Sequence, residues 1–264
     1  MSLTRQAAAI TITLALSSTA LGQALIAVDS NRNLYDIDMA TGAKTQIGQV
    51  SANASTTAGL AYDSVSNTVW VTSTGNDSVY TLDLVTGTAT LIGAYGDSAI
   101  VMHGLEWDPS TGTLYGVSSH NNGLYRISTT TGAATLVGTS GLSSFTNLGY
   151  NSATDTMYAT NSGTDSFYQM DRATGATTLI GPLGGGSTNP NGMAYNSDNG
   201  LLYMVDNSAD NLYTINMATG AATLIGSTGA GNLLGLVYIP IIPAPGTIAL
   251  LALGLVGSRR RRQG

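Results

Sequence analysis

Short runs of alternating hydrophobic and polar residues recur along the chain, separated by Gly, Asn, Asp and Ser. One stretch contains four such runs: GLAYD (59–63), TVWVTS (68–73), SVYTLD (78–83) and ATLIG (89–93). A period of two, bounded by turn-forming residues, predicts β-strands. Helical repeats would need apolar positions at a spacing of 3.6 residues, and that pattern does not appear. The stretch therefore predicts four short strands.

These four runs occur five times. A tyrosine in the third run marks each copy, and the intervals between them are 45, 45, 43 and 45 residues: Tyr35, Tyr80, Tyr125, Tyr168 and Tyr213. Four strands in a repeat of about 45 residues are typical of a β-propeller blade. We therefore expect an all-β fold, a five-bladed β-propeller of four-stranded blades.

The two ends of the repeat array complement each other. The first copy opens directly on a second-type strand, ALIAVDS (24–30), and the missing first strand appears after the last copy as LLGLVYIP (233–240). Pairing these segments would complete five blades and remove free sheet edges. We expect the C-terminal strand to close the ring by completing the N-terminal blade.

Two repeated features have structural explanations. Nearly all Tyr and both Trp residues fall at one position in each of the first, second and third strands, which suits packing between blades. A polar residue stands four places before the Gly of each Thr-Gly pair, where its side chain can bond the backbone and start a turn. These residues are Asp38, Asp83, Ser128, Asp171 and Asn216.

The sequence patterns at the two ends of the chain predict targeting signals. Residues 1–22 have Arg5, an apolar run and small residues, the layout of a secretory signal peptide. Residues 242–264 contain a Pro-rich break, an apolar run of about a dozen residues, which is short for a full span, and four arginines. The propeller is then expected at 23–241. The Pro-rich break and the arginine cluster of this C-terminal segment consist of Pro243, Ala244, Pro245, Arg259, Arg260, Arg261 and Arg262.

This tail resembles the PEP-CTERM sorting signal of Gram-negative bacteria, although Ala244 stands where that family usually has Glu. The resemblance implies recognition by exosortase-type sorting machinery. It also implies export to the cell surface or the extracellular matrix, with membrane attachment through the C-terminal segment before processing. A plain C-terminal membrane anchor is the alternative. Phrases such as WDPSTGTLY resemble YVTN and NHL-type repeats of extracellular bacterial propellers, over roughly residues 24–240.

The amino-acid composition argues against several classes of function. The span from Asp29 to Asp210 holds all 15 acidic residues against four basic ones, so its charge is 4 − 15 = −11. An acidic body without a basic stripe argues against nucleic-acid binding. The chain has no Cys, which excludes disulfides, thiolate metal sites and a Cys nucleophile.

Chemistry is expected on the face that carries the second-to-third and fourth-to-first connections, because binding sites gather on loops held by a rigid scaffold. Glu106, the only Glu, is predicted on an innermost strand, where its carboxyl group could be buried with a raised pKa. The other blades have small or apolar residues there: Ala61, Gly149, Ala194 and Val237. The ligand-binding candidates are Tyr95, Asp97, His103, Glu106, His120 and Asn191.

Carboxylates on the same face give a weaker calcium hypothesis. Ca²⁺ takes six to eight oxygen ligands, although no EF-hand or RTX spacing is present. The candidate ligands are Asp77, Asp165, Asp206 and Asp210. No other cofactor is expected.

Two functions follow from the sequence. The first is a non-enzymatic binding or structural scaffold at the cell surface or in the matrix, with extracellular polysaccharide or surface proteins as partners. The alternative is an extracellular polysaccharide hydrolase or lyase that uses Glu106, Asp97 and His103. Glu106 with Asp97 or Asp77 would supply the required pair of carboxylates.

Overall fold

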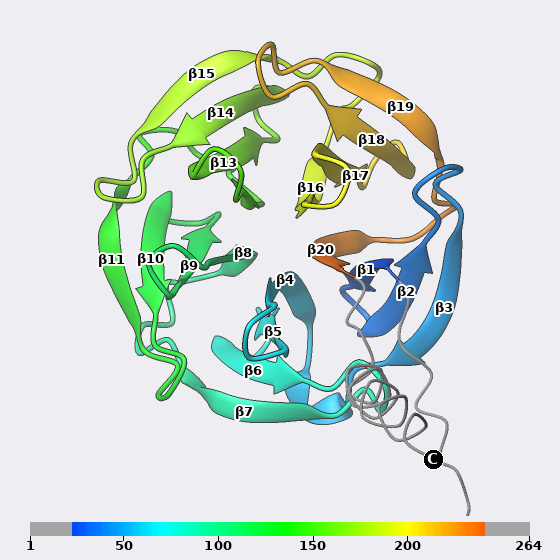
Figure 1. The fold of residues 1–264 in the computed structure, drawn as a ribbon. Helices are drawn as coiled ribbons and strands as arrows, with labels where there is room; N and C mark the ends of the chain where they lie inside the picture. Colours follow the sequence, from blue (N-terminus) through cyan, green and yellow to red (C-terminus); the bar gives the residue numbers. More distant parts are fainter. Residues whose placement is uncertain (1–22, 241–264) are drawn as a thin grey trace, which may run out of the picture. The chain divides into compact units, whose positions relative to one another are not determined.

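The computed structural model describes residues 23–240. This part of the chain contains twenty strands and one turn of 3-10 helix, η1 (Ala52–Ala54). It contains no helix long and apolar enough to cross a bilayer. The strands form five separate antiparallel sheets of four strands, set around a central axis (Figure 1). The expected five-bladed β-propeller is confirmed.

In every blade the first strand is innermost and the fourth is outermost (Figure 1). The first blade contains β20 (Leu233–Ile239), β1 (Ala24–Asp29), β2 (Asn33–Ile37) and β3 (Lys44–Gln49). The second contains β4 (Thr57–Asp63), β5 (Thr68–Ser73), β6 (Ser78–Leu82) and β7 (Ala89–Ala94). The third contains β8 (Met102–Asp108), β9 (Thr113–Ser118), β10 (Gly123–Ile127) and β11 (Ala134–Thr139). The fourth contains β12 (Gly149–Asn151), β13 (Thr156–Asn161), β14 (Ser166–Met170) and β15 (Thr177–Pro182). The fifth contains β16 (Pro190–Asn196), β17 (Leu201–Asp206), β18 (Asn211–Ile215) and β19 (Ala222–Ser227).

The ring is closed by the two ends of the described chain. β20 pairs antiparallel with β1, from Ala24 opposite Ile239 to Asp29 opposite Leu233. The last strand of the array thus becomes the innermost strand of the first blade, as expected.

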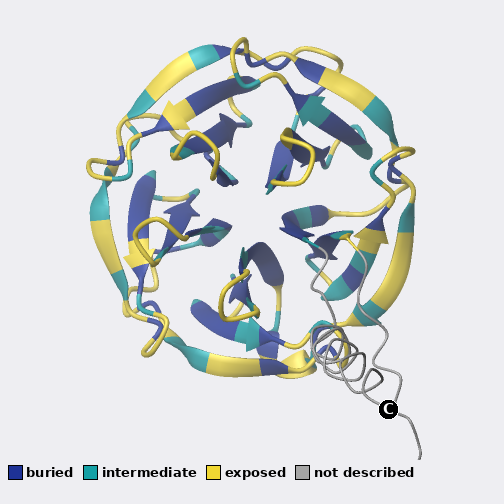
Figure 2. Cartoon of the chain, viewed as in Figure 1, coloured by how far each residue is buried: buried dark blue, intermediate teal, exposed yellow. Residues whose placement is uncertain are grey.

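Five apolar clusters lie between adjacent blades rather than around the axis. The recurrent aromatic side chains supply much of them. Trp70 of the second blade, for example, lies with its ring centroid 5.0 Å from that of Trp107 in the third. Buried positions fill the inner and middle strands, whereas the outermost strands alternate with exposed ones (Figure 2). The prediction that these aromatic residues pack between blades is confirmed.

The Thr-Gly turns form as predicted. Asp171 Oδ1 accepts hydrogen bonds from the backbone N–H groups of Ala173 (2.7 Å) and Thr174 (3.2 Å). Gly175 follows with a φ of 75°, a conformation that Gly adopts without steric cost. The other four copies make the same bonds.

The same turn also packs against the preceding blade, which explains why the phrase is repeated. A Cβ atom placed on Gly138, in the outermost strand of the third blade, would lie 1.9 Å from the carbonyl oxygen of Thr174. Gly138 follows a β-bulge in that strand. Gly93, Gly181 and Gly226 meet the neighbouring turn in the same way, whereas Gly48 of the first blade does not. The turn and the glycine therefore join four of the five pairs of adjacent blades, and the bulge interrupts the exposed edge.

Candidate functional site

The ring has two faces, and the antiparallel strands fix which connections each face carries. We call the face with the first-to-second and third-to-fourth turns the turn face, and the opposite face the loop face. Chemistry was expected on the loop face, with Glu106 on an innermost strand of the channel. The larger cavity of the central channel opens on the turn face instead.

Glycines close the channel between the two faces. A Cβ atom on any of four of them would lie 2.3–2.7 Å from a backbone atom of the next innermost strand or of the segment that leads into it: Gly59, Gly104, Gly192 and Gly235. The fourth blade has Asn147 near this level, with its buried side chain bonded to Thr160 and to the Asn191 carbonyl. The cavity left at this level is only about 10 Å³, so the two ends of the channel are separate sites.

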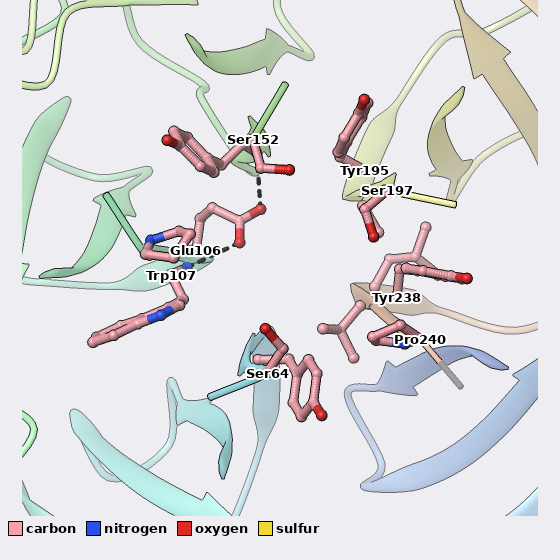
Figure 3. Close-up of a pocket in the computed structure, with 14 residues that line it drawn as sticks. Ser64, Glu106, Trp107, Ser152, Tyr195, Ser197, Tyr238 and Pro240 are labelled. Carbon is pink, nitrogen blue, oxygen red and sulfur yellow. Dashed lines mark hydrogen bonds between the residues drawn. The ribbon is translucent and has the colours of Figure 1, made fainter. Parts of the chain in front are cut away.

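On the turn face the channel widens into a cavity of about 110 Å³, which we call the channel mouth (Figure 3). One aromatic residue from each innermost strand lines it: Tyr62, Trp107, Tyr150, Tyr195 and Tyr238. The residues two positions further along form its rim: Ser64, Pro109, Ser152, Ser197 and Pro240. Because the same repeat positions line it in every blade, this pocket follows directly from the fold.

Glu106 breaks the fivefold pattern of the channel mouth. Its carboxyl group points toward the centre of the cavity (Figure 3), from a position where the other blades have small or apolar side chains. Oε1 accepts a hydrogen bond from the Trp107 N–H (2.9 Å), and Oε2 accepts one from the Tyr150 N–H of the next blade (3.0 Å). These bonds fix the orientation of the carboxyl group.

The environment of Glu106 favours its neutral form. Burial raises the pKa of Glu106 to about 8, although the two backbone hydrogen bonds act in the opposite direction. Between residues 23 and 240, no Lys, Arg or His lines the channel mouth. At neutral pH Glu106 is therefore mostly a carboxylic acid, which can donate one hydrogen bond and accept others.

The other predicted partners of Glu106 lie elsewhere. Asp97 is exposed in the connection before β8, at the loop face, and its Oδ1 accepts a hydrogen bond from the Ala99 N–H (2.8 Å). Asp77 also lies on the loop face, between β5 and β6. His103 precedes Glu106 by three residues, roughly 10 Å along a strand. The structure thus does not assemble the predicted carboxylate pair.

His103 and His120 form a small group on the loop-face side of the closed channel. His103 Nδ1 lies 2.8 Å from Ser119 Oγ, which lies 3.3 Å from His120 Nδ1. Burial lowers the pKa of His103, and the neighbouring His120 lowers it further. These two candidates are together, but they are separated from the channel mouth.

Two further candidates are core residues. Tyr95 is buried, and its hydroxyl donates a hydrogen bond to the Ser78 carbonyl (2.9 Å). Asn191 is buried on β16, and its amide donates a hydrogen bond to the Asn189 carbonyl (3.0 Å). Both side chains have structural partners and face neither cavity of the channel.

The four predicted calcium ligands belong to turns of three different blades. Asp77, Asp165 and Asp210 each have a positive φ, the left-handed conformation their turns require. Asp206 is buried and accepts hydrogen bonds from Ser187, Thr188 and Asn189 as well as from its own turn, which together lower its pKa against the effect of burial. Within residues 23–240, no three His, Asp or Glu side chains are grouped closely enough to hold a metal ion. The calcium hypothesis gains no support from this arrangement.

The signal peptide at 1–22 and the sorting residues Pro243, Ala244, Pro245 and Arg259–Arg262 lie outside the described residues. Both remain predictions.

Sequence reasoning missed an ion-pair group at the turn face. Arg172, in a third-to-fourth turn, pairs with Asp108 of the preceding blade and, at 2.8 Å, with Asp155. The signal was present in the repeat, because the equivalent residues are uncharged: Met39, Leu84, Thr129 and Met217. Hydrogen bonds from Tyr150, Ser110 and Arg172 lower the pKa of Asp155.

Comparisons with known proteins agree on the fold. The model of a family described as "Repeat of unknown function (DUF6923)" matches residues 6–147, which is 142 of the 264 residues. A search of curated proteins finds no match.

Among solved structures, 670 chains match. A chain in a nidogen/laminin complex is similar with a TM-score of 0.57 and 15% identity, over 83% of this chain and 84% of that one. A protein of unknown function from Bacteroides thetaiotaomicron VPI-5482 has a TM-score of 0.58 and 18% identity, over 86% of this chain and 66% of that one. A symmetrical protein described as emerging de novo has a TM-score of 0.55 and 21% identity, over 84% and 100%. At these identities the likeness shows the fold alone.

Proposed function

We propose that this chain, which belongs to the family of DUF6923 repeats, is a non-enzymatic binding scaffold. It would hold a small polyhydroxyl ligand, such as the end of a neutral saccharide, in the channel mouth. One observation carries this proposal. In a ring of near-equivalent blades, a single carboxyl group points into the cavity that the repeat creates.

The chemistry of the cavity favours a neutral ligand with hydroxyl groups. Glu106 is mostly protonated at neutral pH and can both donate and accept hydrogen bonds. The exposed hydroxyl groups of Ser64, Ser152 and Ser197 stand at the rim. Apolar and aromatic groups supply the rest of the wall, a combination common in small-molecule sites.

The contacts favour binding over the hydrolase or lyase alternative. Glycoside hydrolysis normally needs two carboxyl groups on either side of the scissile bond. Asp97 and Asp77 belong to the loop face, and among the residues that the structure describes, Glu106 is the only Asp or Glu that lines the channel mouth. A single carboxyl group can bind a sugar hydroxyl without cleaving a bond.

The location proposed for this scaffold rests on the two ends of the chain. The signal-peptide pattern of residues 1–22 and the PEP-CTERM-like order of residues 242–264 support export and exosortase-dependent sorting to the cell surface or matrix. Extracellular polysaccharide would be the natural partner there.

Glu106→Ala tests the proposed site, because Ala61 and Ala194 occupy the equivalent position in two other blades and the fold should tolerate it. We expect the wild-type chain to be retained on neutral glycans of a microarray, and the variant to bind about tenfold more weakly, as the loss of one or two hydrogen bonds implies. Ala194→Ser, a polar change on another innermost strand, is the control. Unchanged retention of Glu106→Ala, or no retention of the wild type on any neutral glycan, would refute the site.

A further inference from the structure

Four charged residues that depart from the repeat lie at the boundary between the third and fourth blades on the turn face, which we call the seam. Glu106 and Arg126 come from the third blade, and Asp155 and Arg172 come from the fourth. At the position of Arg126 the other blades have Asp36, Thr81, Gln169 and Thr214. At the position of Asp155 they have Asn67, Gly112 and Gly200.

A groove of about 510 Å³ lies along the seam, separate from the channel mouth. Its lining is mainly polar and includes both arginines and the carboxylates of Asp155 and Asp171. Hydroxyl and amide groups come from Thr111, Tyr115, Thr156, Gln169 and Thr178. It is several times larger than the channel mouth and opens on the same face.

Arg172 forms a fixed wall of this groove. Besides its pairs with Asp108 and Asp155, it donates a hydrogen bond to the Asp155 carbonyl (3.1 Å), and its guanidinium group lies 5.3 Å from the ring centroid of Tyr150. Tyr150 also donates a hydrogen bond to Asp155 (2.6 Å). The ion pairs balance the positive charge of Arg172, and the pair with Asp108 links the third and fourth blades.

Arg126 is different, because its charge has no partner. Among the described cationic side chains, Arg32 donates to the Val50 carbonyl, and Lys44 donates to the carbonyls of Gly229 and Ala230. Arg126 makes neither a side-chain hydrogen bond nor an ion pair with any residue between 23 and 240, and it is exposed. Cross-strand from it is Tyr115, whose ring is buried and whose hydroxyl has no described partner.

We propose that the seam groove binds an acidic saccharide, with the guanidinium group of Arg126 holding a uronic-acid carboxylate. A planar guanidinium group matches a carboxylate in bidentate geometry. The surrounding hydroxyl and amide groups can pair with sugar hydroxyls. The strongly acidic body repels polyanions in general, so retention of an acidic saccharide requires a specific contact such as that with Arg126. This site is independent of the channel mouth.

Affinity electrophoresis of the full chain in gels containing polygalacturonate tests this proposal, with neutral dextran as the reference. Arg126→Thr restores the residue of Thr81 and Thr214, so the fold should be kept. We expect polygalacturonate to retard the wild type, and Arg126→Thr to bind about tenfold more weakly, the effect of losing a charge-assisted hydrogen bond. Arg126→Lys should bind at an intermediate level because it keeps the charge without the fork.

Arg32→Asn is the matched control, since it removes the same charge on the loop face and introduces a residue type found at the equivalent turn position, Asn122. It should be retarded like the wild type. Equal retardation of wild type and Arg126→Thr, equal losses in Arg32→Asn and Arg126→Thr, or no retardation of the wild type would each overturn the proposal. Neutral-glycan retention should be weakened about tenfold in Glu106→Ala and kept in Arg126→Thr, so the two sites fail independently.

Discussion

We expect that a chain ending at Asn232 will not fold cooperatively. It lacks β20, the innermost strand of the first blade, and with it five buried apolar side chains: Leu233, Leu236, Val237, Tyr238 and Ile239. At about 2 kcal/mol each, their burial contributes on the order of 10 kcal/mol, comparable with the whole stability of about 5–15 kcal/mol expected of a domain. The loss also uncovers the edge of β1 at a gap in the ring, which invites aggregation.

Circular dichroism during heating measures this effect. A chain ending at Pro240 is the control, because it keeps every contact described for β20, and we expect it to melt in one sharp transition. The chain ending at Asn232 should show a broad change or precipitate. A sharp transition in both chains would mean that the ring does not depend on its closing strand.

The second large effect is a loss of stability between about pH 5 and pH 8 that Glu106→Gln removes. The carboxyl group has its ordinary pKa near 4.5 when the chain is unfolded and a pKa of about 8 when it is folded. Between these values the folded state binds more protons than the unfolded state, so the free energy of unfolding falls as pH rises. The slope approaches about 1.4 kcal/mol per pH unit, and the total is a few kcal/mol.

Comparison with the variant isolates this contribution from other titrating groups. The lowered pKa of His103 acts with the opposite sign, because protonation of the unfolded state below pH 6.5 weakens folding there. Asp residues with a lowered pKa, such as Asp206, lose their contribution only at acid pH. If the Glu106→Gln substitution itself changes the free energy of unfolding by a pH-independent amount, the curve of the variant against pH moves up or down without a change of slope.

Urea unfolding at several pH values gives both curves. The account predicts that the stability difference between wild type and Glu106→Gln changes steadily in favour of the variant from pH 5 to pH 8. Parallel curves would show that Glu106 has an ordinary pKa and a solvated environment.

Much of the fold could be predicted because it is local and repeated. The period of Tyr35, Tyr80 and their equivalents gives the blade number, and the unpaired strands at the two ends give the closure. Strand alternation and turn residues need only neighbouring positions in the sequence. None of this requires knowledge of how one blade contacts the next.

The candidate site was harder to predict from the sequence than the fold, because it depends on contacts between blades. Glu106 stood out as an exception to the repeat, but the close approach of strands at Gly104, which closes the channel, is a property of the ring. Arg172 and Asp108 are 64 positions apart and meet only because their blades are adjacent. Loop composition drew attention to the loop face, whose Asp and Asn residues prove to hold turns. Both proposed sites rest on departures from the repeat, and Arg126 could have been singled out in this way from the sequence.

The most direct test of the account is a measurement of which face binds. The chain has no Cys, so a single introduced thiol can be labelled selectively with a polyethylene glycol maleimide. Ala173→Cys places the label beside the seam groove on the turn face, and Ser208→Cys places it on the loop face, both at exposed positions. The account predicts that the label at Ala173 abolishes retention by polygalacturonate, while the label at Ser208 leaves it unchanged. Loss of retention with the label at Ser208 alone would place binding on the loop face and contradict the account.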